Sequence, residues 1–312
     1  MSTYLERYQS GEYESVWNEL VFLGASVRQE PVYADSLAVA REIMRRVRHD
    51  IEILVDRLVQ RHFIFGYDHR VQPVFHGEYP AEQRREYLEM FAWAHKQPPV
   101  FVASRQREEE RFENEALSDL TFDEEEPDSV LTEEGNEDSH TMSSFVDEIE
   151  QLVGAVPLAM RAWYEEVGGV NFYGYHTEWD QRYRSWYPPI LKHTVSSRLM
   201  SECDPLMVCP LDKALMMRLR REYKAGELYR LEFAEDRYFK DYCNGSSSPY
   251  AFTLPDAAAD SLLYCFDFNQ PVTFVQYLRT SILRWGGFPG LAQWPTAPID
   301  DVAFLTQGLI PF

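Results

Sequence analysis

Apolar residues recur at helical spacing in the first part of the chain. Between Glu12 and Val27 they follow steps of three and four residues, which predicts an amphipathic helix. From Leu37 to Leu58 the same steps continue over three heptads, the strongest periodic pattern in the sequence. We expect this second helix to pair with the first one within the chain, and a coiled-coil dimer is the alternative. A third helix over Ala81–Lys96 completes a helical N-terminal region, residues 1–105, which is either a small domain or an extension docked on the rest of the chain.

The stretch Leu152–His176 is predicted to form a helix, a glycine turn and a strand. Pro157 starts the helix, because its fixed φ suits the first turn and its missing amide hydrogen is not needed there. Gly168 ends the helix and Gly169 opens the turn, so we assign both as structural turn residues. Apolar and polar positions then alternate over Val170–Tyr175, the pattern of one strand.

Further alternation predicts a sheet in the second half of the chain. Three short segments close together in the sequence alternate in this way: Leu228–Phe233, Tyr250–Leu254 and Leu262–Phe266. We expect them to form an antiparallel meander, with a shorter strand in Asp204–Cys209 and a helix over Leu211–Tyr223. The last long helix starts at Pro271 and stops at Gly286 and Gly287, which we also assign as structural turn residues. Helices combined with an antiparallel sheet indicate an α+β fold.

Four of these stretches carry a family resemblance. They are the unit at Leu152–His176, LEFAEDRYFKDY at Leu231–Tyr242, YAFTLPDAAAD at Tyr250–Asp260 and FVQYLRTSILRWGGFPGL at Phe274–Leu291. In this order they resemble the SUKH superfamily, over about half of the chain from Ser143 to Leu291. The resemblance implies a SUKH-like α+β domain at residues 143–312, with a largely antiparallel sheet flanked by helices and a C-terminal tail.

The SUKH superfamily includes fungal cell-wall-synthesis regulators of the Smi/Knr type and many bacterial proteins, a number of them immunity proteins against secreted toxins. The resemblance therefore implies a non-catalytic protein that binds another protein, and it offers no catalytic residues to carry over. The most concrete expectation is a bacterial immunity protein that neutralises a toxin. A regulatory or scaffold protein like the fungal members is the alternative.

Charge narrows the choice of partner. The formal net charge is −21, which argues against a nucleic-acid or anionic-membrane partner, because phosphates require a basic face. It favours a basic protein partner, such as many toxin domains, since opposite charges speed association. Much of the charge lies in residues 108–138, which hold 15 acidic residues and a single arginine, Arg111. We expect residues 106–142 to be an acidic linker, with docking onto a basic surface as the alternative.

Residues that could hold a metal or a cofactor show no suitable spacing. The four cysteines lack a CxxC pair, and proline and glycine interrupt the three histidines that recur every seven residues: Cys203, Cys209, Cys243, Cys265, His62, His69 and His76. The turn at Gly286–Gly290 lacks the lysine and hydroxyl of a phosphate-binding loop. We therefore expect neither a metal site nor a cofactor. The sequence also lacks a secretion signal and a membrane-length apolar run, so a cytoplasmic location is expected.

An enzyme would need acids and bases that converge in space. The candidates are Glu178, Asp180, Asp236, Asp241, Asp256 and Asp260, with His176 or His193 as a base. Any acidic α+β protein offers such a set, and turn positions such as Asp256 have ordinary backbone-capping roles. We expect no enzymatic activity and no catalytic residues, and an acidic-residue hydrolase remains the second alternative.

The segment Trp179–Pro189 is unusually rich in aromatic residues and arginine. This composition is typical of protein interfaces, where rigid aromatic side chains anchor a partner. The predicted partner-binding residues are Asp180, Tyr183, Trp186 and Tyr187. A packed loop over the sheet is the alternative interpretation.

Overall fold

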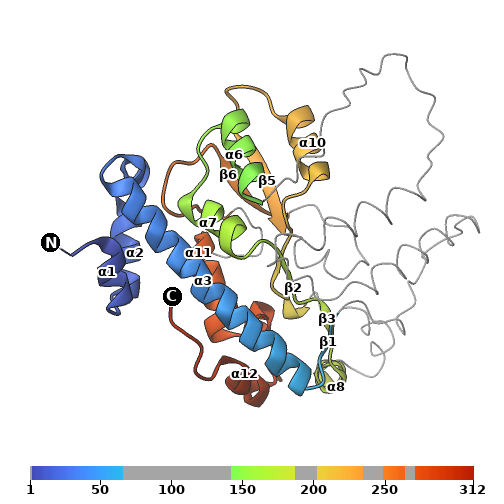
Figure 1. Cartoon of the computed structure of the whole chain (residues 1–312). Helices are drawn as coiled ribbons and strands as arrows, with labels where there is room; N and C mark the ends of the chain where they lie inside the picture. Colours follow the sequence, from blue (N-terminus) through green and yellow to red (C-terminus); the bar gives the residue numbers. More distant parts are fainter. Residues whose placement is uncertain (1, 66–141, 187–201, 235–248, 264–270) are drawn as a thin grey trace, which may run out of the picture.

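The computed structural model describes residues 2–65, 142–186, 202–234, 249–263 and 271–312 (Figure 1). The predicted helix at Ala81–Lys96 and almost all of the predicted acidic linker lie outside these ranges. Of that linker, only Met142 is included, as the first residue of a helix.

Four helical elements form the N-terminal part: α1 (Tyr4–Gln9), α2 (Tyr13–Phe22), the 3-10 helix η1 (Gly24–Arg28) and α3 (Val32–Gln60). The short α1 was not predicted, although a local signal for it exists. The Thr3 hydroxyl accepts from the Glu6 amide, and the Glu6 carboxylate accepts in return from the Thr3 amide. This reciprocal capping box satisfies amides that the first helical turn leaves without partners.

The heptad stripe on α3 is confirmed as a buried face. All its residues are at most 9% exposed: Leu37, Ala40, Met44, Val47, Ile51, Leu54 and Leu58. Its partner differs from the prediction, because α3 packs mainly along α7 (Leu158–Glu166) and less on α1 and η1. Leu158–Tyr164 are all buried and all apolar except Arg161, so α7 buries apolar surface on more than one side. A stripe buried within the chain is not free to form the alternative coiled-coil dimer.

The remaining helical elements belong to the second half of the chain. They are α6 (Met142–Val153), α8 (Thr177–Trp186), α10 (Lys213–Glu222), α11 (Phe274–Arg279), the π-helix η4 (Thr280–Arg284), the 3-10 helix η5 (Pro289–Gln293) and α12 (Ile299–Thr306). The predicted last helix is therefore confirmed, with a change of helical type at Thr280. No helix in the described ranges combines the length and the apolarity that crossing a membrane requires.

All described strand pairs are antiparallel, which confirms the α+β class. The pairs are β1 (Ile64–Phe65) with β3 (Gly174–Tyr175), β2 (Val170–Asn171) with β4 (Met207–Val208), and β5 (Tyr229–Ala234) with β6 (Tyr250–Leu254). Beyond β4, the Cys209 amide donates to the Phe233 carbonyl at 2.6 Å, which joins the second pair to the third. Of the third predicted meander strand, Leu262 forms an isolated antiparallel bridge with Thr273, and residues 264–270 lie outside the described ranges.

The prediction of one strand over Val170–Tyr175 is wrong. Two strands form there, and they pair with different partners. Between them, the side-chain oxygen of Asn171 accepts from the Tyr173 amide at 2.8 Å, a local turn that competes with strand continuation. Because β1 follows α3 directly, its pairing with β3 ties the N-terminal helices to the second half.

One continuous hydrophobic core runs from Tyr8 near the start of the chain to Phe312. Figure 1 shows α3 as a long diagonal, with α7 beside it, α1 and α2 at one end and α12 near the other. The N-terminal helices therefore correspond to the docked-extension alternative, and the described residues of the two halves share a core.

Candidate functional site

The predicted contact segment forms helix α8, and two of its four candidate residues are buried. Asp180 is 4% exposed and Tyr183 is 1% exposed, and the Tyr183 ring stacks on Trp294 with centroids 4.9 Å apart. These two side chains do not lie on the surface, so their prediction as exposed anchors is corrected. The side chain of Trp186 and the whole of Tyr187 lie outside the described part of the chain.

The buried face of α8 is held by a short hydrogen-bond network. Trp179 donates from Nε1 to Asp301 at 2.9 Å, and its amide donates to Nδ1 of His176 at 3.2 Å. The other ring nitrogen of His176 lies 2.6 Å from the Arg61 carbonyl, so it carries the proton. Burial lowers the pKa of His176, which favours this neutral form. His176, considered as a catalytic base, therefore has a structural role between α8 and the end of α3.

Asp260 joins an N-terminal helix to the start of α11. Its carboxylate accepts from Trp17 Nε1 at 3.2 Å, from the Ser261 amide at 2.9 Å and from the Phe274 amide at 3.1 Å. Burial raises its pKa to about 6, while the hydrogen bonds favour the charged form. With these partners, Asp260 acts as a helix cap and an interhelical tie.

A buried ion cluster holds α6 against α7. Arg161 contacts Glu150 at 2.6 Å, Asp147 at 2.9 Å and Glu165 at 3.2 Å, and its side chain is only 10% exposed. Glu150 also pairs with Arg28 at 2.8 Å, which adds η1 to the cluster. A guanidinium that binds three carboxylates suits packing between helices better than acid–base chemistry.

The other acid–base candidates that the structure describes, Glu178 and Asp256, do not converge on a shared site. Glu178 lies on the exposed side of α8, and Asp256 accepts from the Ala258 amide at 3.0 Å, as expected for a turn. Asp236, Asp241 and His193 lie outside the described ranges. Among the residues that the structure describes, no three His, Cys, Asp or Glu side chains are grouped as metal ligands would be. Burial raises the pKa of Cys203, which keeps that thiol protonated and unreactive.

The predicted turn glycines lie at tight positions. Gly168, directly after α7, has a φ of 89°, a conformation that glycine adopts without a Cβ clash. A Cβ on Gly169 would lie 3.1 Å from Cδ of Pro210, so this position needs glycine for a close approach. Gly286 and Gly287 have φ values of 60° and 96° directly after η4 and Trp285.

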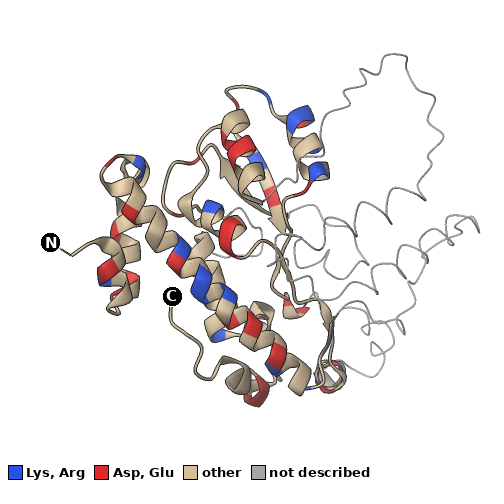
Figure 2. Ribbon diagram, in the orientation of Figure 1, with Lys and Arg blue, Asp and Glu red and all other residues tan. Residues whose placement is uncertain are grey.

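Two exposed apolar side chains lie on helices of opposite charge, Phe22 on the acidic α2 and Met217 on the basic α10. Phe22, at the end of α2, is 91% exposed, and Glu19, three residues earlier on this helix, pairs with Arg7 at 2.7 Å. Met217, on α10, is 67% exposed and is surrounded by basic residues such as Arg221. Figure 2 shows this contrast as red segments on α1 and α2 and blue segments on α10.

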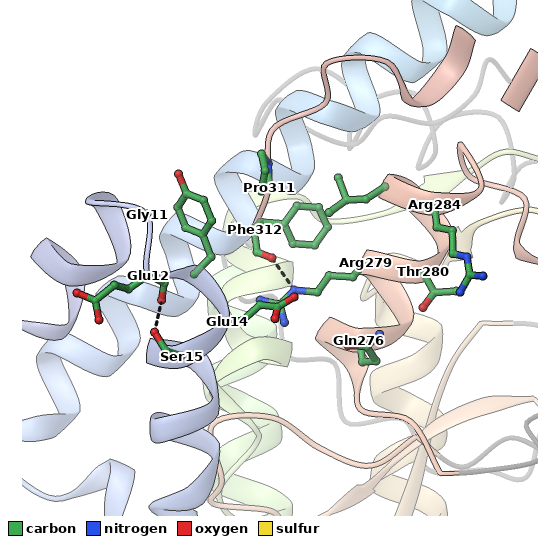
Figure 3. Close-up of a pocket in the computed structure, with 12 residues that line it drawn as sticks. Gly11, Glu12, Glu14, Ser15, Gln276, Arg279, Thr280, Arg284, Pro311 and Phe312 are labelled. Carbon is green, nitrogen blue, oxygen red and sulfur yellow. Dashed lines mark hydrogen bonds between the residues drawn. The ribbon is translucent and has the colours of Figure 1, made fainter. Parts of the chain in front are cut away.

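A cavity of about 600 Å³ lies between the turn from α1 to α2, the helices α11 and η4, and the C-terminal residues (Figure 3). Arg279 reaches into it, and its Nε donates to the Phe312 carbonyl at 2.5 Å. Its Nη2 is buried and has no hydrogen-bond partner in the described part of the chain. Burial lowers the pKa of Arg279, because a desolvated guanidinium is less stable than one in water. We call this space the Arg279 cavity.

Sequence reasoning missed this cavity, because its walls come from segments that are more than 250 residues apart. In the sequence, Arg279 is one cation in an amphipathic helix. Comparison of the chain with protein-family models, with curated proteins and with solved structures found no match.

Proposed function

We propose that this chain is a cytoplasmic, non-catalytic protein of SUKH type that binds and neutralises a basic toxin. The resemblance over Ser143–Leu291 and the net charge of −21 support this proposal. Opposite charge on inhibitor and toxin increases the association rate, which matters for a protein that must act before its target does damage.

The partners of the buried polar side chains support the proposal that this protein is not an enzyme. Asp260 ties α2 to α11, the Arg161 cluster joins α6 to α7, and Asp301 holds Trp179 of α8. Among the described acid and base candidates, His176, Asp256 and Asp260 bind structural partners. A catalytic group also needs access to a reacting atom, which the buried side chains of His176 and Asp260 lack.

We place the contact surface on the outer face of α2. Asp180 and Tyr183 are buried, whereas Phe22 is almost fully exposed on the helix that carries Glu14 and Glu19. An exposed aromatic side chain loses little conformational entropy on binding, and such residues dominate many interfaces. The acidic residues Glu14 and Glu19 of α2 complement a basic partner, whereas the arginines of α10 do not.

Co-expression tests the proposal. The chain would be expressed with each toxin encoded next to its gene, and growth and co-purification would be measured. We expect one toxin to be neutralised and to co-purify with the chain in a fixed ratio. Binding without rescue of growth would favour the regulatory or scaffold alternative. The absence of both, with every neighbouring toxin, would rule out the immunity function.

A further inference from the structure

Four exposed residues lie along one side of α10 and form what we call the basic face. Met217 is four residues from Lys213 and from Arg221 and three from Arg220, so the four side chains are neighbours on the helix surface. The other side of the helix packs in the core through Leu219. Met217 is 67% exposed, and the cations of α10 are drawn in blue in Figure 2. A single exposed apolar side chain is common, so the cations beside it decide what could cover this face.

The two arginines of the basic face have carboxylate partners but keep donors for more. Arg220 donates from Nε and Nη2 to Glu148, and Arg221 donates from Nη2 to Glu222 at 3.2 Å. Their side chains remain 57% and 76% exposed, and ion pairs with this exposure are weak. Another nearby acid, Asp212, is used as the cap of α10. Since a guanidinium has five N–H donors, both arginines can bind a further carboxylate.

The sequence of this chain contains a segment of matching chemistry. Residues 108–138, which we call the acidic segment, hold 15 acidic residues against the single Arg111. Apolar residues interrupt the acids in its first half: Phe112, Leu117, Leu120 and Phe122. An acidic segment with spaced apolar residues suits a face where cations lie beside an exposed methionine, because charge and apolar surface are both complementary.

The chain also ties the acidic segment close to the basic face. Its last residue, Asp138, lies four residues before Met142, the start of α6, and four residues span about 14 Å at most. Glu148, the partner of Arg220, lies six residues further, or about 9 Å along the helix. The segment therefore ends within about 23 Å of this contact. Such a tether gives an effective concentration on the order of millimolar, which favours this occupant over a separate acidic partner or a second copy of the chain.

We propose that the acidic segment, residues 108–138, docks on the basic face of α10 in the same chain. Its carboxylates bind the guanidinium donors that Glu148 and Glu222 leave unused, through charge-assisted hydrogen bonds. One of its phenylalanine or leucine side chains covers Met217 and removes that side chain from water. Docking neutralises the cations, so the basic face attracts other anions less strongly.

Photo-crosslinking of the full chain at low micromolar concentration tests this proposal. Met217 is replaced by the photoreactive residue p-benzoylphenylalanine, and the adducts are located by mass spectrometry. The control carries the same residue in place of Val59, which is 57% exposed on α3. We expect most adducts from position 217 to lie in residues 108–138 of the same chain, and few from position 59. Equal yields from the two positions, adducts between two chains, adducts confined to other segments, or no adducts would each overturn the proposal.

Salt and substitutions show whether charge holds the segment in place. The adduct yield from position 217 should fall between 0.1 M and 1 M salt, as the Debye length shortens from about 10 Å to about 3 Å. Arg220→Gln combined with Arg221→Gln should lower the yield about threefold, the effect of two exposed ion pairs. The matched control combines Arg45→Gln with Arg48→Gln, two exposed and ion-paired arginines of α3, and should leave the yield unchanged. A yield that neither salt nor the α10 substitutions lower would contradict docking on these cations.

Discussion

Trp17 donates a hydrogen bond from Nε1 to Oδ2 of Asp260 at 3.2 Å, across 243 positions of sequence. Both side chains are buried, and Asp260 also caps the start of α11. The bond therefore links the second helix of the chain to the helix that carries Arg279. Such a link explains why the N-terminal helices share the core of the second half and do not form a separate domain.

Trp17→Phe should lower the free energy of unfolding by about 1–3 kcal/mol more than its control, because a buried charged acceptor loses a donor. The control is Trp294→Phe, which removes the same atoms from a ring that is also buried. Nε1 of Trp294 has no hydrogen-bond partner in the described residues, so only packing is lost. Chemical denaturation measures both. Equal losses would show that Trp17 contributes through packing alone.

Sequence patterns predicted the elements whose buried face is a regular stripe. The heptads of α3, the helix α7 with its glycine stop and the alternation of β5 and β6 all follow local periodicity. This periodicity did not predict which elements pack against one another. The stripe on α3 is equally compatible with α2 or α7, and the larger apolar surface of α7 decides between them.

The segment of α8 shows why the candidate site was harder to predict. Trp179 and Tyr183 are aromatic residues among charges, which is equally typical of an exposed interface and of a helix packed on one side. Their burial depends on Asp301 and Trp294, more than 100 positions later. No local pattern contains that information. The Arg279 cavity was missed for the same reason.

Asp50 makes stability depend on pH. Its carboxylate is buried in α3 and accepts from the Ile310 amide at 2.9 Å, and burial raises its pKa to about 6. The nearby cations His49, Arg57 and Arg46 lower that pKa but do not cancel the effect of burial. In the unfolded chain the pKa is about 4, so between about pH 4 and pH 6 the folded state binds more protons. This group therefore stabilises the fold as pH falls through 6.

Asp50→Asn keeps an acceptor for Ile310 and removes the charge. We compare the unfolding free energy of Asp50→Asn with that of the natural chain. The variant should exceed the natural chain by about 1–3 kcal/mol more at pH 7 than at pH 4. Groups with lowered pKa, such as Glu150, change stability in the opposite direction but are common to both proteins. Denaturation of both proteins across this range measures the difference. A difference that is constant with pH would show that Asp50 has an ordinary pKa.

Two glycines with similar backbone strain should differ in their tolerance of alanine. Gly226 and Gly287 have φ values of 86° and 96°, but a Cβ would meet nothing within 4 Å at Gly226 and the Phe172 ring at Gly287. Gly226→Ala should destabilise by about 1–2 kcal/mol through strain alone. Gly287→Ala should destabilise by about 1–3 kcal/mol more through overpacking. Thermal denaturation compares them. Equal losses would mean that the Phe172 ring moves aside easily.

The last prediction concerns the outer face of α2 and a toxin recovered by co-purification. Phe22→Ala should weaken binding by about 2 kcal/mol, which corresponds to about 30-fold in affinity, without lowering stability, because Phe22 is 91% exposed. Met217→Ala, an exposed apolar residue in basic surroundings, is the control and should leave affinity unchanged. The association rate should fall as salt rises, since the Debye length shortens below about 8 Å. If Met217→Ala weakens binding and Phe22→Ala does not, the partner contacts α10 and is not attracted by the acids of α2.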